Sequence, residues 1–163
     1  MRHDAGGEAG ELVERLGLKP HPEGGYFCET YRSALSVTAR EISRPALTSI
    51  YYLLTRESFS AFHRIASDEI WHHYLGGTVA IESIDPSGTH RRALIGREDR
   101  HQAAIPAGTW FAAHPCDGAE YALVGCDVAP GFDFEDFELG SRANLCGEFP
   151  HHRDLIERWT RPA

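Results

Sequence analysis

The stretch from Ser60 to Gly77 concentrates side chains that can carry protons or hold a metal ion. In an extended strand, successive side chains point to opposite faces, so Glu69, Trp71 and His73 are expected to share one face. The preceding segment carries His63 with the same alternation, and a turn sequence joins the two segments. We therefore predict that His63 and Glu69 converge in one pocket inside a β-fold.

The residue types on this face indicate acid–base chemistry. Burying a carboxylate costs several kcal/mol unless the group is paired or used, which favours a functional role for Glu69. His63 and His73 are candidate acids or bases, because imidazole titrates at about pH 6.5. Trp71 offers a flat apolar wall for a sugar or base ring, although core packing explains a tryptophan equally well. His72 points to the opposite face, unless a β-bulge exchanges it with His73.

The elements that position these residues fit into one domain, since 163 residues are enough for one well-buried core and too few for two ordinary ones. Residues 1–10 are polar and Gly-rich, and we expect a disordered tail there. The single domain then covers residues 11–163. It begins with a short helix from Glu11 to Leu16, which Gly17 ends, and closes with another from Asp154 to Trp159.

Strands dominate between these helices. Alternation and aromatic or β-branched content predict further strands at 26–32, 47–54, 78–84, 90–95, 101–105, 109–113 and 120–127, with a loop or ragged hairpin at 33–45. About eight to ten short strands at a spacing of about ten residues predict an all-β sandwich or barrel. Phe132, Phe134 and Phe137 alternate with acidic residues, and we expect them to close one edge of that fold.

Charge and composition argue against several partners. The chain has 16 basic and 24 acidic residues, a net charge of −8, and no basic cluster longer than Arg91-Arg92, so we expect no nucleic-acid partner. No apolar run approaches the ~18 residues that span a membrane, and residues 1–10 lack the apolar region of a signal peptide. We therefore expect a cytoplasmic protein without a membrane partner. The scattered cysteines have no C-x-x-C or zinc spacing, which predicts reduced, unmetallated thiols.

The organising stretch resembles the first motif of the cupin superfamily, G-x5-H-x-H-x3-E-x6-G, with His63 and Glu69 at its first His and its Glu. The second motif, G-x5-P-x-G-x2-H-x3-N, is echoed by Ile105-Pro106-Ala107-Gly108. Ile65 and Phe111 stand where the second and third metal-binding histidines of these motifs would be. Hydrocarbon side chains thus replace imidazoles at both positions.

Five longer motifs resemble, in order, the DUF985 or cupin_5 family. They are HPEGGYFCETYR (His21 to Arg32), TSIYYLL (Thr48 to Leu54), SDEIWHHYLGG (Ser67 to Gly77), IPAGTWFAA (Ile105 to Ala113) and LVGCDVAPGFDFEDFELG (Leu123 to Gly140). The resemblance implies a double-stranded β-helix, the cupin jelly-roll barrel also used by nucleotide-sugar 3,5-epimerases, with short terminal helices. It also implies a homodimer. The densest motif adds Glu23, Tyr26 and Arg32 as candidate ligand-binding residues.

Three functions follow from these residues. The first is a metal-independent epimerase or isomerase, in which His63, Glu69 and His73 move a proton next to the carbonyl of a sugar or nucleotide sugar without a cofactor. The second is a non-catalytic protein that binds a small molecule. The third is an enzyme that uses a divalent metal, with the same three residues as ligands. Ile65 and Phe111 favour the first two, because they remove coordination and make the pocket drier.

Overall fold

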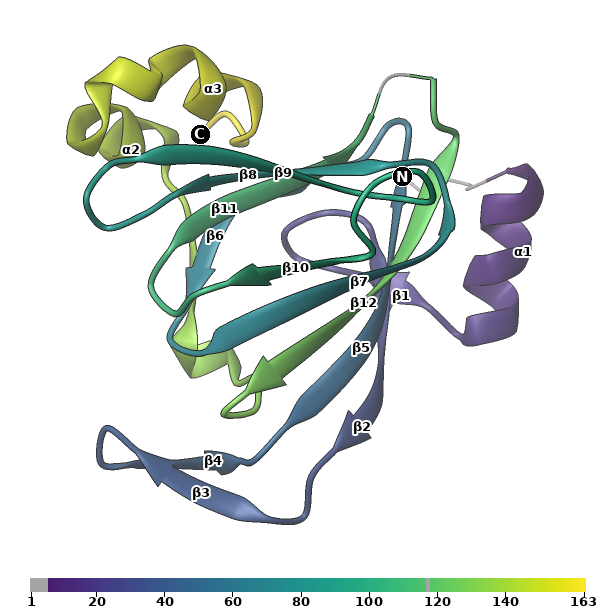
Figure 1. Cartoon of the computed structure of the whole chain (residues 1–163), viewed down its shortest axis with the longest axis horizontal. Helices are drawn as coiled ribbons and strands as arrows, with labels where there is room; N and C mark the ends of the chain where they lie inside the picture. Colours follow the sequence, from purple (N-terminus) through teal and green to yellow (C-terminus); the bar gives the residue numbers. More distant parts are fainter. Residues whose placement is uncertain (1–5, 117) are drawn as a thin grey trace.

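Two facing β-sheets with helices on their outer surfaces make up the computed structural model, which describes residues 6–116 and 118–163 (Figure 1). The six-stranded sheet has the order β1 (Lys19–Pro20), β2 (Tyr26–Arg32), β5 (Thr48–Thr55), β12 (Tyr121–Ala129), β7 (Asp68–Gly76) and β10 (Gln102–Ile105). The five-stranded sheet has the order β13 (Phe137–Leu139), β6 (Ser60–Ile65), β11 (Trp110–Pro115), β8 (Val79–Ile84) and β9 (His90–Ile95). Neighbouring strands pair antiparallel, as in a jelly roll.

The predicted β-rich class is confirmed, and the expected strands are present within a few residues of their predicted bounds. The expectation of a closed barrel needs correction, because the ladders of the described strands form separate sheets rather than one closed ring. β1, β13 and the helix α2 (Arg142–Glu148) were not predicted. They are short, and tertiary contacts rather than local periodicity define them.

The main core lies between the two sheets, where alternate side chains of each strand point inward. Its fully buried members include Tyr52, Trp71, Ile81, Phe111 and Val124. In β6 and β7, the side chains that point inward are those predicted from the alternation of the sequence. His63, Glu69 and Trp71 therefore belong to the inner layer, whereas Ile70 and Tyr74 remain exposed.

Helices cover both outer faces. Helix α1 (Gly7–Leu16) packs Leu12 against Leu53 and Leu123 on the six-stranded sheet. Helices α2 and α3 (Arg153–Arg158), with the 3-10 turn η2 (Pro150–His152) between them, cover the five-stranded sheet (Figure 1). Helix α1 begins earlier than expected, so residues 7–10 of the predicted tail are helical; residues 1–5 lie outside the described residues. None of the described helices is long and apolar enough to cross a membrane.

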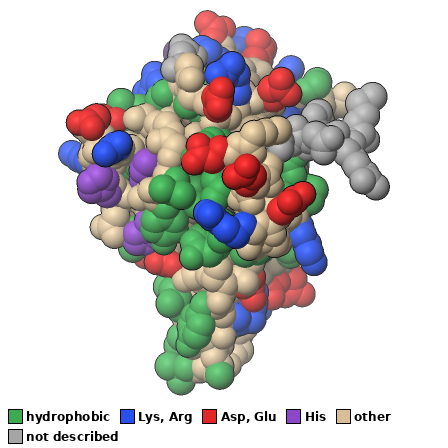
Figure 2. All heavy atoms as spheres, turned by 90° about the vertical axis from the view of Figure 1, so that its right-hand side faces the viewer, with side chains coloured by type: hydrophobic (Ala, Val, Ile, Leu, Met, Phe, Trp, Pro, Cys, Tyr) green, Lys and Arg blue, Asp and Glu red, His purple; other side chains and the backbone are tan. Residues whose placement is uncertain are grey.

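A hairpin of β3 (Ser36–Ala39) and β4 (Ile42–Pro45) projects from the body, as the lower lobe in Figures 1 and 2 shows. Arg40 and Glu41 both have positive φ, as the tight turn of a two-residue hairpin requires. Arg44 ties the base of the hairpin to Asp136 through an Nε–Oδ2 contact of 2.8 Å. Asp136 belongs to the 3-10 turn η1 (Phe134–Asp136), so the hairpin is anchored beside the segment that follows β12.

Candidate functional site

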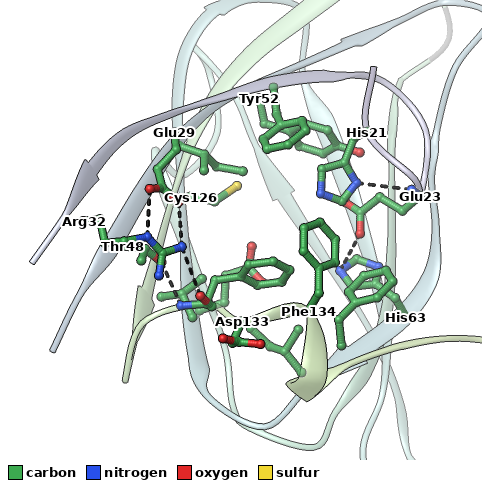
Figure 3. A pocket seen from close by; sticks show the side chains of 17 residues that line it. His21, Glu23, Glu29, Arg32, Thr48, Tyr52, His63, Cys126, Asp133 and Phe134 are labelled. Atoms are coloured by element: carbon green, nitrogen blue, oxygen red, sulfur yellow. Dashed lines mark hydrogen bonds and ion pairs between the residues drawn. The ribbon is translucent and has the colours of Figure 1, made fainter. Parts of the chain in front are cut away.

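A cavity of about 220 Å³ lies between the sheets and is bordered by the segment from Phe132 to Phe137 (Figure 3). Its lining falls into three groups. Acid–base side chains are His21, Glu23, Tyr52, His63, Glu69 and Cys126; charged side chains are Glu29, Arg32 and Asp133; aromatic side chains are Phe27, Phe132, Phe134 and Phe137. Thr48, Ile50, Ile65 and Val128 complete the lining. The site is therefore an aromatic pocket with several proton-carrying groups.

The loop between β1 and β2 brings Glu23 into this pocket. Gly24 has φ +115°, and a Cβ there would lie 2.1 Å from the carbonyl oxygen of Phe59, so only glycine lets the loop pass this close. The carbonyl oxygen of Glu23 accepts the Ala61 N–H at 3.0 Å, which docks the loop on β6. Its carboxylate accepts the Ser60 hydroxyl at 2.7 Å and is almost fully buried.

Glu23 and His63 form a pair that must share a proton. The Nδ1 of His63 lies 2.8 Å from the Ala61 carbonyl oxygen, which can only accept, so Nδ1 carries a hydrogen. The Nε2 of His63 lies 3.0 Å from Glu23 Oε2. A favourable contact there needs one more proton, either on Nε2 or on the carboxyl group. The pair is therefore either imidazolium with carboxylate or imidazole with carboxylic acid, and its net charge is zero in both forms.

Glu69 supplies a second proton carrier. Burial, followed by the nearby charge of Glu23, raises the pKa of Glu69 to about 8. Hydrogen bonds from the Trp71 indole, at 3.0 Å, and from the Cys126 thiol oppose this rise. Glu69 is thus mainly protonated at neutral pH, with an ionised fraction that can accept a proton. Burial also raises the pKa of Cys126 well above its usual value, so its thiol stays protonated.

His21 and Tyr52 surround the Glu23 carboxylate. Burial is the main factor that lowers the pKa of His21, with the charge of Glu23 acting in the opposite direction. Its Nδ1 accepts the backbone N–H of Glu23 at 3.2 Å, so the neutral ring carries its hydrogen on Nε2. The Tyr52 hydroxyl donates to the Gly24 carbonyl, and burial raises its pKa far above the usual range. Both groups therefore stay uncharged at neutral pH.

Arg32 lies at the opposite side of the cavity from the Glu23–His63 pair (Figure 3). Its Nε and Nη2 donate to the two carboxylate oxygens of Glu29 at 2.9 and 2.8 Å. Nη2 also donates to the carbonyl of Phe132 at 3.3 Å. Between the two ends, Phe132, Phe134 and Phe137 pack edge-to-face, and Phe137 stacks on His63 at 5.5 Å. The three phenylalanines thus form the wall beside the acid–base pair.

The structure separates the predicted site residues into two groups. Glu23, Arg32, His63 and Glu69 line the cavity. His73 does not: a strand rise of about 3.3 Å per residue carries it roughly 13 Å beyond Glu69. It lies in a shallow surface hollow, where its Nε2 meets the Gly77 carbonyl at 3.0 Å.

The expected placements of Trp71 and Tyr26 also need correction. Trp71 is 1% exposed and lies behind Glu69, packed edge-to-face against Tyr52 and Phe111, so it does not form a wall of the cavity. Tyr26 points to the other face of β2, where it packs in the cluster below α1. The phenylalanines after β12 provide the aromatic wall instead.

Most of the other lining residues were missed as candidates, among them His21, Tyr52, Cys126 and Phe137. Sequence signals existed for some of them. His21 opens the motif that also contains Glu23, and alternation along β5 places Tyr52 on the same face as Ile50. Cys126 had no signal, since its role depends on pairing between β12 and β7.

The donor set does not fit the usual cupin metal centre. Ile65 lines the cavity, and Phe111 packs against the His63 ring at 4.2 Å, so both positions that would carry imidazoles present carbon. Both ring nitrogens of His63 already have partners. Across residues 6–116 and 118–163, no group of three or more His, Cys, Asp or Glu side chains is arranged to hold a metal ion. His63, Glu69 and His73 do not converge as a ligand set.

Comparison with known proteins identifies the family. A model described as "Cupin superfamily (DUF985)", Cupin_5, matches residues 10–140, which is most of the chain. The chain belongs to the Cupin_5 family. An uncharacterized protein of Saccharomyces cerevisiae is 30% identical to this Cupin_5 protein, over 77% of this chain and 72% of the yeast protein.

Solved structures share the fold of this Cupin_5 chain. A hypothetical protein from Leishmania major is 37% identical, with a TM-score of 0.89 over 93% of this chain and 98% of the other. A protein from Shewanella oneidensis is 36% identical, with a TM-score of 0.86 over 94% and 97% of the two chains. Oxalate decarboxylase from Bacillus subtilis is 19% identical, with a TM-score of 0.56 over 86% of this chain and 36% of that chain, and this likeness concerns the cupin fold alone.

Proposed function

We propose that the cavity is the active site of a metal-independent epimerase or isomerase, which moves a proton at a carbon next to a carbonyl of a small ring-shaped ligand such as a sugar. The observation that carries this proposal is the Glu23–His63 contact of 3.0 Å, whose shared proton faces the same cavity as Glu69. Enzymes that carry out such steps use groups whose pKa lies near the working pH. The pKa of about 8 for Glu69 meets that requirement.

The protonation states described above suggest a role for each residue. The ionised fraction of Glu69 takes the proton from the carbon, and the electrons of the broken C–H bond move to the carbonyl oxygen as an enolate. The enolate oxygen competes with Glu23 Oε2 for the proton between Glu23 and His63 Nε2, and a hydrogen bond from that proton stabilises the enolate. For an isomerisation, Glu69 returns the proton to the former carbonyl carbon. For an epimerisation, the Glu23–His63 pair delivers a proton to the opposite side of the same carbon, and proton exchange with water restores both groups. Ser60 holds Glu23 in place through its 2.7 Å hydrogen bond.

The size of the cavity limits the ligand. Sites for drug-sized molecules have volumes of about 300–1,000 Å³, whereas this cavity measures about 220 Å³. One ring fits this space, and the nucleotide of a nucleotide sugar would lie outside it. The aromatic residues Phe27, Phe132 and Phe137 suit the apolar face of such a ring.

Deuterium exchange tests the proposal. The protein is incubated with a panel of keto sugars, sugar lactones and nucleotide-linked keto sugars in deuterated water, and NMR detects deuterium at the carbon beside the carbonyl. Glu69→Gln should lower the exchange rate by ~10²–10⁴, as removal of a general base does. Glu135→Gln is the matched control, since Glu135 is an exposed carboxylate outside the cavity. Saturable binding without exchange across the panel would leave the alternative of a non-catalytic binding protein.

We also propose a homodimer. Leu35, just before β3, and Ile42, in β4, are 67% and 45% exposed, and a second copy of the chain would cover them. Light scattering after size-exclusion chromatography decides this. A mass near that of one 18.1 kDa chain at micromolar concentration would refute the dimer.

A further inference from the structure

We propose that the cavity accepts uncharged ring ligands and rejects anionic ones. This inference rests on the proposed function only in taking the cavity as the ligand site, and it narrows the ligand from sugars in general to those without phosphate or carboxylate groups. Its basis is the charge balance of the lining. Each cationic group there already has an anionic partner within the protein.

The inner end of the cavity carries no net charge. The Glu23–His63 pair is neutral overall, because its two members share one proton over 3.0 Å. Glu69 is mainly protonated at neutral pH, and burial keeps His21 in its neutral form. A ligand carboxylate or phosphate placed here would lose its hydration without meeting a free positive charge, which is strongly unfavourable.

The outer end offers no free cation either. Arg32 is the one guanidinium among the described residues of the lining. Arginine binds anions well through two parallel N–H donors. In Arg32 one such pair, Nε and Nη2, already donates to the Glu29 carboxylate at 2.9 and 2.8 Å. A ligand anion that leaves Glu29 in place could reach only the Nη1 donors of Arg32, on a guanidinium whose charge Glu29 already balances.

Asp133 adds a negative charge at the same end. Its Oδ1 accepts the backbone N–H of Glu135 at 2.8 Å, and the charge of Asp133 contributes to raising the pKa of Arg32. Glu29 and Asp133 thus face one guanidinium, which leaves an excess of one negative charge. This excess repels anions as they approach, so selection against them begins before they enter the cavity.

A series of three probes with one ring and one carbonyl tests the charge selection. The probes are 4-hydroxycyclohexanone, 4-oxocyclohexanecarboxylate and 4-aminocyclohexanone, which are uncharged, anionic and cationic at neutral pH. Binding to the full-length protein is followed by ligand-observed NMR at low salt. We expect the uncharged probe to bind at least about tenfold tighter than the anionic one, the difference that one unpaired charge makes. The excess negative charge attracts the cationic probe, so it should also bind tighter than the anionic one. Equal or tighter binding of the anionic probe than of either other probe overturns the proposal, as does failure of the uncharged probe to bind at millimolar concentration.

Glu29→Gln gives a second, independent arm. This substitution removes the carboxylate that binds Arg32, so the net charge of the outer end becomes more positive by one unit. The affinity for the anionic probe should rise at least about tenfold, and the affinity for the uncharged probe should change little. Glu135→Gln changes the net charge equally but lies outside the cavity lining, and it should leave both affinities unchanged. An equal gain in the two variants would mean that only overall charge matters, which contradicts the inference.

Deuterium exchange at the ring carbons is read in the same samples and separates this inference from the proposed function. Selective binding of the uncharged probe without exchange would contradict the proposed enzyme activity and support the charge selection. Exchange in all three probes with equal binding would support the enzyme activity and contradict the charge selection.

Discussion

Two buried glutamates, one on each side of the five-stranded sheet, meet histidines in very different ways. The side chains of Glu23 and Glu82 are 6% and 5% exposed, so burial does not distinguish them. Glu23 has one imidazole within 3.0 Å and faces the inner cavity. Glu82 lies on the outer surface of β8, where three basic side chains surround it.

The partners of Glu82 come from neighbouring strands. His90 Nε2 lies 2.7 Å from Oε2, while Arg92 Nε and His114 Nε2 lie 3.4 and 3.5 Å from Oε1. His114 also stacks on Trp159 at 3.8 Å, which links this group to the chain just after α3. The hollow beside Glu82, with a volume of about 670 Å³, is open and is lined by further charged residues.

The difference shows what a buried carboxylate needs in order to move protons. Glu82 has three basic side chains around it, and its contacts with His90 and Arg92 link β8 to β9. Glu23 has one close imidazole, and the proton between Glu23 and His63 can lie on either partner. We therefore expect substitutions in the inner pair to change proton transfer and substitutions in the outer group to change stability.

The largest expected effect comes from substituting one histidine beside Glu23 and, for comparison, one histidine beside Glu82. His63→Asn should reduce the deuterium-exchange rate by ~10²–10⁴, because the shared proton and its donor nitrogen are lost. His114→Asn should leave that rate within about twofold, since its ring lies outside the cavity. Circular dichroism confirms that both variants fold. A loss of exchange in His114→Asn as large as in His63→Asn would erase the distinction between the two groups.

Gly24→Ala should affect the inner group alone. The new Cβ meets the Phe59 carbonyl at 2.1 Å and the residue has φ +115°, so we expect a stability loss of ~1–3 kcal/mol and a displaced Glu23. Gly108→Ala is the control for positive φ without a clash, because nothing lies within 4 Å of that position. Chemical unfolding compares the two. Equal losses would mean that the close approach to Phe59 contributes nothing.

Glu82→Gln should lower the free energy of unfolding by ~1–3 kcal/mol, as loss of hydrogen bonds to charged groups does, and leave exchange unchanged. The half-exposed Arg92 makes the lower end of this range more realistic, because solvent screens its charge. Glu98→Gln, at an exposed position, is the reference. Urea titration at neutral pH measures both, and identical midpoints would show that the outer group does not hold the strands.

The last expected effect is a pH slope. Glu69 has its pKa raised from 4.5 to about 8 in the folded protein, so the folded state binds more protons than the unfolded state between these values. The contribution of Glu69 to stability is therefore fully present below pH 4.5. It is lost as pH rises toward 8, with a slope of up to ~1.4 kcal/mol per pH unit. Glu69→Gln should lack this contribution. Urea midpoints collected from pH 5 to pH 8 compare the slopes, and parallel curves would contradict the raised pKa.

Local periodicity was enough to predict the strands and the inward parity of His63, Glu69 and Trp71. A strand alternates every two residues wherever it lies, so a pattern of five to ten residues carries that information. The same alternation places Glu82 and His114 on the outer face, opposite to Ile81 and Phe111. The family resemblance, confirmed over residues 10–140, added the facing sheets.

Only the tertiary structure decided which of these side chains meet. Glu23 reaches His63 through a loop 40 residues earlier in the chain, because Gly24 allows contact with Phe59, and no periodicity encodes that approach. Alternation shows which face of a strand a side chain occupies, but not how far along the strand the cavity extends. It therefore grouped His73 with Glu69, although the cavity ends well before His73. Partners distant in sequence set the charge state of each buried group, and they are known only once the sheets face each other.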